Sequence, residues 1–388
     1  MKVHKAYKFR LYPNKEQSIL INKTIGCSRY IYNHFLNQWN EVYKETGKGL
    51  SYGKCSAQLT ILKKQEETEW LKEVDSIALQ SSLRNLSDSF DRFFKKQTQF
   101  PRFKSKKTPV QSYTTKATNG NIAVLEDRLK LPKLGMVRFA KSREVEGRIL
   151  NATIRLNPTG KYFVSLLVET EMNTIQKTGS FVGVDVGLKD FAILSDGTTY
   201  ENPKFFRSIE KKLVREQRKL SRRKEQALKE GRKLSESKNY QKQRIKVAKI
   251  HETIKNKRTD YLHKISTEIV KNHDIIGIED LLVSNMLRNR KLAKAISEVS
   301  WYQFRIMLEY KAKWYGKEII AVARNFPSSQ LCSGCGYRNK AVKNLAVRKW
   351  ECPSCGTHHD RDINASINLK QEALRILASK TVGTTELA

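Results

Sequence analysis

Residues 181–187 read FVGVDVG, and residues 274–280 read DIIGIED. Each stretch is a short apolar run that contains one glycine, so each predicts a buried β-strand. Asp185 lies inside the first run, and Glu279 lies at the end of the second. Burying a carboxylate is costly unless a partner compensates its charge, so the sequence predicts a partner for both acids.

A third acidic site is formed by residues 360–365, which read DRDINA at the start of a helix predicted for residues 363–378. Asp360 and Asp362 are both candidates, although an aspartate in this place is often only a helix N-cap. Taken together, the three sites predict convergent carboxylates that coexist because a divalent cation offsets their repulsion. We expect Mg²⁺, as one ion or as two ions about 3.5–4 Å apart. Acids on two strands and a helix form a ribonuclease-H-like pattern.

Four of the six cysteines form two Cys-x-x-Cys pairs, with 16 residues between the pairs: Cys332 with Cys335, and Cys352 with Cys355. This spacing predicts a tetrahedral thiolate site for one structural Zn²⁺. Four unrelated free thiols are a weaker alternative. A redox dithiol is weaker still, because neither pair follows a strand of a redox fold. We expect the adjacent His358 and His359 to support the site or to contact phosphate rather than to bind the metal.

The chain has 388 residues and carries 74 Lys and Arg against 39 Asp and Glu, a formal net charge of +35. So large an excess opposes compaction unless a polyanion neutralises it, which predicts a nucleic-acid-binding protein. A basic membrane-surface protein is the weaker alternative, since no basic amphipathic helix has an aromatic-rich lipid face. There is no apolar signal-peptide core and no apolar run near the roughly 18 residues that span a bilayer. With no disulfide framework, a cytoplasmic location is expected.

Two basic segments are candidates for the contact with nucleic acid. Residues 204–258 hold 21 Lys and Arg against 6 Asp and Glu, and Gly231 predicts a break between two helices. This segment lacks apolar heptads, which favours a phosphate-binding helical arm over a coiled coil. Residues 93–104 mix aromatic and basic side chains, as in base stacking with phosphate contact, or as core aromatics at a helix end. Arg102 and Lys104 are the candidate contacts in this segment.

The rest of the chain alternates between helical and extended patterns. Residues 3–11 predict a strand, residues 15–45 and 76–96 predict helices, and residues 110–170 are β-rich with a hairpin at 157–160. Further short strands are predicted at residues 182–186, 191–194, 198–201, 274–278 and 319–322. We therefore expect a mixed α and β, multidomain protein.

These motifs, in this order, resemble those of the TnpB (OrfB) family of transposon-encoded nucleases, which are related to type V CRISPR effectors. The resemblance covers nearly the whole chain. Besides the cysteine pairs, it is carried by YKFRLYP (7–13), ALQ (78–80), FPRFK (100–104), GVDVGL (183–188), IEDL (278–281), FPSSQLC (326–332) and HDRDINA (359–365).

The resemblance implies a domain organisation that the local patterns alone do not give. The implied domains are a wedge-like β-barrel (residues 1–14 and 108–178), a helical recognition domain (15–107), a RuvC-like nuclease domain (179–326 and 358–388) and an inserted zinc ribbon (327–357). The polar stretch 280–300 resembles the nuclease lid of the family.

The resemblance also implies an RNA-guided DNA endonuclease. A noncoding RNA from the transposon end would pair with target DNA beside a short target-adjacent motif, with the protein expected as a monomer on the RNA. Asp185, Glu279 and Asp362 are implied as the Mg²⁺-binding catalytic acids, with Asp360 as the rival to Asp362. Contacts to the target-adjacent motif are implied, on a looser match, for Tyr52, Ser56 and Gln80.

Two other functions remain open from the residues. One is a transposase or resolvase on the same nuclease fold that cuts DNA without a guide. The other is a nucleic-acid-binding regulator without turnover, which the intact acidic motifs disfavour.

Overall fold

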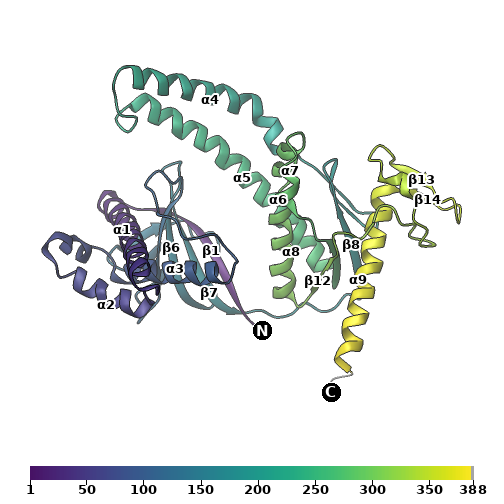
Figure 1. Cartoon of the computed structure of the whole chain (residues 1–388), viewed down its shortest axis with the longest axis horizontal. Coiled ribbons are helices and arrows are strands. Elements are labelled where there is room, and N and C mark those ends of the chain that lie inside the picture. The colour runs from purple at the N-terminus through teal and green to yellow at the C-terminus, as the bar shows by residue number, and fades with distance from the viewer. Residues whose placement is uncertain (386–388) are drawn as a thin grey trace. The chain divides into compact units, whose positions relative to one another are not determined.

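The computed structural model describes residues 1–385 and divides them into two compact units. Residues 2–171 form one unit, and the residues from Met172 onward form the other together with Met1. Each unit has its own sheet and its own hydrophobic core (Figure 1). The predicted mixed α and β, multidomain fold is confirmed at this level. None of the described helices is both long and apolar enough to cross a membrane.

The sheet of residues 2–171 is antiparallel and has seven strands in the order β2-β6-β7-β1-β5-β4-β3. The strands are β1 (Lys2–Tyr12), β2 (Gln111–Lys116), β3 (Ala123–Leu125), β4 (Arg128–Leu131), β5 (Gly135–Phe139), β6 (Arg148–Leu156) and β7 (Tyr162–Glu171). The predicted β-rich stretch and the hairpin between β6 and β7 are confirmed. Among the described strands, β2 and β3 at the two edges do not pair, so the sheet is open and the predicted barrel is not confirmed.

Helices pack beside this sheet within the same unit. They are α1 (Lys15–Thr46), α2 (Tyr52–Leu62), the 3₁₀ helix η1 (Glu66–Glu73) and α3 (Ser76–Phe94). α1 begins where Asn14 and Gln17 form a reciprocal capping box, and it ends at Gly47, whose φ is +68°. The helices predicted at 15–45 and 76–96 are confirmed. α2 and η1 were not predicted, because each is short and buries only two residues.

The second unit contains a mixed five-stranded sheet in the order β10-β9-β8-β11-β12. Its strands are β8 (Phe181–Val186), β9 (Asp190–Leu194), β10 (Thr199–Glu201), β11 (Ile275–Glu279) and β12 (Glu318–Val322). β8, β11 and β12 run parallel, whereas β9 and β10 are antiparallel to their neighbours. All five predicted strands of this region are confirmed.

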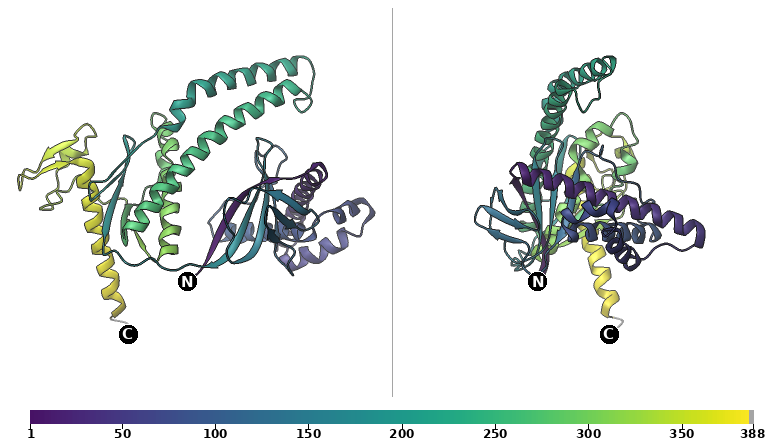
Figure 2. Two further views of the ribbon diagram at one scale, coloured as in Figure 1. Left: turned by 180° about the vertical axis from the view of Figure 1, so that it is seen from behind. Right: turned by 90° about the vertical axis from the view of Figure 1, so that its left-hand side faces the viewer.

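The helix α9 (Arg361–Thr385) packs directly on β8 and β11, and it is the yellow helix beside the sheet in Figure 2. Gly183 and Gly277 lie opposite each other in the parallel register. A Cβ atom at Gly183 would lie 1.9 Å from the carbonyl oxygen of Ser366, and one at Gly277 would lie 2.7 Å from that of Leu369. The paired glycines therefore leave the space that the helix backbone occupies.

The opposite face of this sheet is covered by α5 (Lys238–Asn272) and α8 (Trp301–Tyr315). Val182 and Val184 flank Gly183 and belong to the core cluster that contains Leu262 and Phe304 from these helices. Because neighbouring side chains of a strand point to opposite faces, α9 and the α5–α8 pair enclose the sheet from two sides. Two short helices, α6 (Val283–Met286) and α7 (Ala293–Val299), precede α8.

The basic stretch forms a helical hairpin of α4 (Phe205–Lys229) and α5, seen as the two long helices in Figure 1. Gly231 has a φ of +64° in the turn, so the predicted break is confirmed. Only a small cluster around Leu213 and Val247 is buried between the helices. Lys211, Arg218 and Arg222 of α4 are exposed, and the part of the chain that is described gives them no ion pair.

Candidate functional site

The parallel register brings Asp185 and Glu279 to the same end of the sheet. Val184 of β8 lies opposite Ile278 of β11, so the two acids follow at matching positions where these neighbouring strands end. The carboxyl ends of adjacent parallel strands are a common location for ligand sites in α/β folds. The glycine two residues before each acid is the one on which α9 packs.

Asp362 reaches the same place from the first turn of α9. Ser366, which contacts Gly183, lies one helical turn after Asp362, so the start of α9 lies toward the strand ends. Asp185, Glu279 and Asp362 together line one cavity of about 380 Å³. The structure thus brings together the three acids that the sequence analysis singled out.

The cavity disfavours negative charge on its acids. Burial, and then the charges of Asp362 and Glu279, raise the pKa of Asp185 to about 8. Burial and the neighbouring Asp280 also raise the pKa of Glu279. A pKa raised by desolvation and like charges indicates a place where a cation would be stabilised. The oxygen-only donor set suits a hard ion such as Mg²⁺.

Three basic residues, Lys189, Arg348 and Arg361, line the cavity, and Arg348 pairs with one of its acids. The Nη1 atom of Arg348 is 3.2 Å from Oδ2 of Asp362 and 3.3 Å from Oδ1. Arg348 precedes β13 (Lys349–Glu351), and its carbonyl oxygen accepts a hydrogen bond from the backbone N–H of Arg361. The sequence analysis missed Arg348, because only the tertiary fold places this residue against the acids.

Asp360 has a different role from Asp362. Its Oδ1 atom accepts hydrogen bonds from the backbone N–H groups of Asp362 and Ile363, at 3.0 and 3.2 Å. This is the geometry of a helix N-cap, which satisfies two free donors of the first turn of α9. The structure therefore shows the N-cap alternative for Asp360 and places Asp362 at the cavity.

Asp280 is likewise set apart from its neighbour Glu279. Hydrogen bonds from Arg305 and Arg324 lower the pKa of Asp280, so its carboxylate is already neutralised by two guanidinium groups. Glu279 has no such partner among the residues that the structure describes, and it lines the cavity. A second, more apolar cavity of about 600 Å³ adjoins Glu279 and is lined by residues of the 280–300 stretch, α8 and Arg324.

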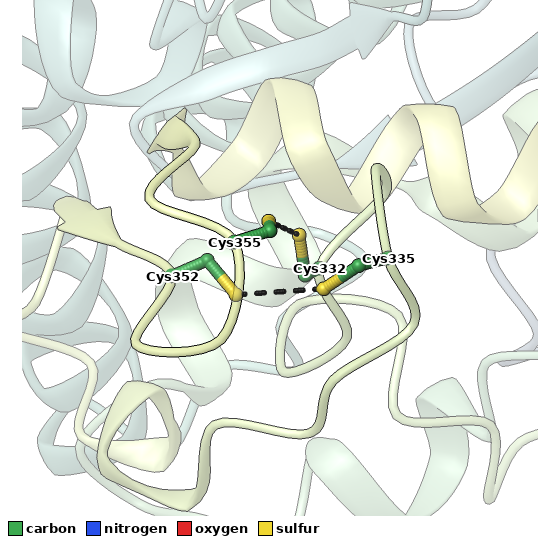
Figure 3. Close-up of side chains that lie close together, drawn as sticks. All are labelled: Cys332, Cys335, Cys352 and Cys355. Carbon is green, nitrogen blue, oxygen red and sulfur yellow. Dashed lines mark hydrogen bonds between the residues drawn. The ribbon is translucent and has the colours of Figure 1, made fainter.

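The four cysteines form the most compact candidate metal site. One ligand atom from each of the four lies within 4.8 Å of all the others, and they are the only such group of three or more His, Cys, Asp or Glu among the described residues. The sulfurs of Cys332 and Cys355 are 3.6 Å apart, as are those of Cys335 and Cys352, and dashed lines join each pair in Figure 3. Four sulfurs about 2.3 Å from a tetrahedral zinc would lie roughly 3.8 Å apart. The thiolates therefore fit Zn²⁺.

Backbone turns hold both knuckles in place. The N–H groups of Gly336 and Gly356 donate to the carbonyl oxygens of Cys332 and Cys352, and both glycines have positive φ angles. The Nε2 atom of His359 lies 3.0 Å from the sulfur of Cys332. His359 therefore supports the cysteine cluster from outside.

The nucleic-acid contacts implied for Tyr52, Ser56 and Gln80 lie together. The hydroxyl groups of Tyr52 and Ser56 both donate to Oε1 of Gln80, at 3.2 and 3.1 Å, and the guanidinium of Arg84 lies 4.0 Å from the Tyr52 ring centroid. These residues come from α2 and α3, which pack against each other.

Both basic candidates of the FPRFK motif are exposed residues, but their side chains have different partners. Arg102 is exposed and donates to Gln99. The Nζ atom of Lys104 lies over the ring of Tyr32, 3.8 Å from its centroid.

Three family models match successive parts of the chain. They are described as "Helix-turn-helix domain" of the OrfB IS605 type at residues 1–48, "Probable transposase" of the same type at 164–290, and "Cas12f1-like, TNB domain" at 301–369. In the structure, residues 1–48 contain β1 and α1 rather than two helices.

Relatives match over nearly the full length. A Streptomyces pristinaespiralis protein named "Putative RNA-guided DNA endonuclease" is 39% identical over 373 residues, which cover 95% of this chain and 89% of that protein. InsQ of Escherichia coli, named in the same way, is 35% identical over 395 residues, with 97% and 94% covered. The "TnpB-like protein L79" of Acanthamoeba polyphaga mimivirus is 24% identical, with 95% and 73% covered.

Among solved structures, a cryo-EM structure of a "Cas12f1-sgRNA-target DNA complex" aligns with a TM-score of 0.56 at 13% sequence identity. The alignment covers 95% of this chain and 99% of that chain. At this identity the likeness is one of fold.

Proposed function

The chain belongs to the TnpB (OrfB) family, and on that premise we propose that it is an RNA-guided DNA endonuclease that hydrolyses phosphodiester bonds at Asp185, Glu279 and Asp362. The observation that carries this proposal is the convergence of these acids on one cavity. The names of the Streptomyces pristinaespiralis and Escherichia coli relatives support the RNA-guided activity.

The proposed nuclease centre is RuvC-like, which the order β10-β9-β8-β11-β12 and the acids on β8, β11 and α9 support. Bound Mg²⁺ would activate the attacking water and stabilise the leaving oxygen of the phosphodiester. The chain contributes the positions of the oxygens: strand pairing fixes Asp185 and Glu279, and packing on Gly183 and Gly277 fixes the start of α9.

Arg348 balances charge in this proposal. Its guanidinium neutralises part of the charge of Asp362 before a metal binds. The same guanidinium would also be able to donate to a phosphate oxygen of a strand in the cavity. Arg348 belongs to the proposed zinc ribbon (residues 327–357), and its carbonyl oxygen accepts a hydrogen bond from the backbone N–H of Arg361 at the start of α9. Through this contact the ribbon would be connected to the proposed nuclease centre.

The remaining assignments are proposals of the same kind. The guide is a noncoding RNA from the transposon end, double-stranded DNA is the target, and Tyr52, Ser56 and Gln80 read the target-adjacent motif. Residues 1–14 and 108–178 form a wedge-like domain, residues 15–107 form the recognition domain, and residues 280–300 form the lid. The protein acts in the cytoplasm as a monomer on its RNA.

The test compares variants of the acids in RNA-loaded protein. Asp185→Ala, Glu279→Gln and Asp362→Asn should each abolish cleavage of target DNA in Mg²⁺ while leaving RNA binding intact. Asp360→Asn is the matched control, because asparagine caps a helix as well as aspartate does, so cleavage should persist.

Full cleavage by the Asp185→Ala variant would remove the proposed centre. Cleavage by protein stripped of RNA would instead favour a guide-free transposase or resolvase. Binding of target DNA without any nicking across a Mg²⁺ titration would favour a regulator.

A further inference from the structure

A second polar cavity, of about 230 Å³, lies within the unit of residues 2–171. α1, α3, β2 and the segment 104–110 contribute its walls. Its lining includes Arg29 and Lys104 but no aspartate or glutamate. At about 30 Å³ for each water molecule, the space holds several waters or one small anionic group.

The hydroxyl group of Ser28 is an unusual feature of this cavity. Ser28 is 4% exposed, lines the cavity from α1, and has an Oγ atom without a hydrogen-bond partner among the described residues. A buried hydroxyl without a partner is costly, and such groups in folded proteins usually face a ligand or an ordered water.

The two cations of the cavity have no acidic partner within the described residues. Arg29 donates from Nη1 to Oε1 of Gln111 at 2.9 Å, and Lys104 lies over the Tyr32 ring. None of the ion pairs found in the described part of the chain includes either residue. Lys104 is exposed as a residue, but desolvation of its ammonium group lowers its pKa to about 8, and an anion beside that group would oppose the shift.

The wall that carries Lys104 is held in place by hydrogen bonds. The side chain of Asn33 accepts from the backbone N–H of Lys104 at 2.7 Å and donates to its carbonyl oxygen at 2.9 Å. The Nε2 atom of Gln111 donates to the carbonyl oxygens of Ser105 and Thr108 at 3.2 and 2.7 Å. The site is therefore formed before a ligand arrives, which reduces the ordering cost of binding.

We propose that this cavity binds one backbone phosphate of a nucleic acid, with Ser28, Arg29 and Lys104 donating to its oxygens. A phosphodiester is an acceptor-only anion that hydroxyl, guanidinium and ammonium groups bind together. The inference rests on the proposed function for the presence of nucleic acid, and it adds a defined phosphate site. The phosphate belongs either to the RNA or to the target DNA, and the two arms of the experiment distinguish these sources.

The experiment measures binding across a salt series in two arms, using full-length protein with the Glu279→Gln substitution to prevent cutting. The first arm uses the RNA that copurifies with the protein, transcribed in vitro. The second uses target duplex bound by RNA-loaded protein. Lys104→Met keeps the stem over Tyr32 but removes the charge. Lys104→Met should weaken binding about tenfold in one arm. It should also reduce the slope of log affinity against log salt concentration by about 0.7–0.9 in that arm.

Ser28→Ala separates a ligand role from a structural one. It should weaken binding several-fold in the same arm as Lys104→Met, without changing the salt slope. The free protein should melt no lower than the unsubstituted protein, because an unpaired buried hydroxyl has been removed. The Ser28→Ala and Lys104→Met effects should not be additive, since both groups contact one phosphate.

The matched control is Lys106→Met, an exposed lysine that does not line the cavity. If Lys104→Met and Lys106→Met weaken binding equally and Ser28→Ala has no effect, the charge acts only diffusely and the site is refuted. If protein with the native Glu279 binds both nucleic acids but does not cut DNA, the proposed function is refuted. The binding measurements would still decide whether the cavity holds a phosphate.

Discussion

At the scale of single residues, Asp185 has opposite requirements for stability and for the proposed metal binding. Its pKa rises from 3.8 to about 8 on folding, mainly because of burial. Between these two pH values the folded protein holds a proton that the unfolded chain releases. The contribution of Asp185 to stability therefore becomes less favourable as the pH rises from about 4 to about 8.

Asp185→Asn should consequently raise the melting temperature in Mg²⁺-free buffer, and more so at pH 8 than at pH 5. A gain of about 1 kcal/mol or more corresponds to roughly 2–4 °C for a unit of this size. Thermal unfolding at both pH values measures the effect. Adding Mg²⁺ should stabilise the protein with Asp185 and reduce its difference from the variant. A variant that is less stable at pH 8 would show that the carboxylate is compensated within the chain.

The two aspartates of the DRDINA motif show what a sequence pattern leaves open at this scale. Their spacing cannot separate a cap from a ligand, because both roles occur at the first turn of a helix. The hydrogen bonds of Asp360 to backbone N–H groups distinguish them in the structure. Arg348 was missed for a similar reason, since nothing near it in the chain is acidic except Glu351.

At the scale of elements, the contact between α9 and the sheet depends on two glycines. Gly183→Ala would place a methyl group 1.9 Å from the carbonyl oxygen of Ser366, a backbone atom that cannot rotate away. We expect a loss of more than about 3 kcal/mol in the free energy of unfolding, with loss of cleavage as α9 shifts.

Gly26→Ala in the middle of α1 is the matched control. A Cβ atom there meets nothing within 4 Å, and the φ of Gly26 is not positive. Alanine should therefore stabilise the protein by about 0.5–1 kcal/mol. Denaturant unfolding compares the two variants, and equal effects would contradict the close packing of α9.

The zinc module gives a second prediction at this scale. Zinc-loaded protein should contain one Zn²⁺ per chain, and its four ligand cysteines should react slowly with a thiol reagent. A chelator should release four reactive thiols and most of the folding energy of the module, on the order of 10 kcal/mol. Cys27 and Cys55 should stay slow, because burial raises the pKa of each thiol to about 11. Release of fewer than four thiols would contradict the four-cysteine site.

At the scale of the whole molecule, the net charge of +35 should appear as salt-dependent binding. Lys211, Arg218 and Arg222 lie on α4 at spacings of seven and four residues and are exposed. If each contacts a phosphate, replacing all three with glutamine should reduce the slope of log affinity against log salt by about 2–3. The charge-preserving control Lys211→Arg, Arg218→Lys and Arg222→Lys should keep the slope, and an unchanged slope in the glutamine variant would exclude the arm from binding.

The sequence predicted local elements well and long-range geometry poorly. The strands of the second unit were predictable because short apolar runs end at glycines and acids, and the helices of the first unit because their apolar stripes are long. The order of the seven strands was not predictable, since β1 pairs with β7 across more than a hundred residues. The cavity around Ser28 was equally hidden, because its walls come from separate elements.

The position of α9 has a consequence for protein synthesis. Asp362 follows both strand acids by more than eighty residues, so a ribosome reaches it only after the other parts of the proposed nuclease centre. A product that terminates between α5 and α9 would still contain the basic hairpin of α4 and α5, but it would lack the third acid and the helix that rests on Gly183. Errors of translation would thus yield inert fragments rather than unregulated nucleases.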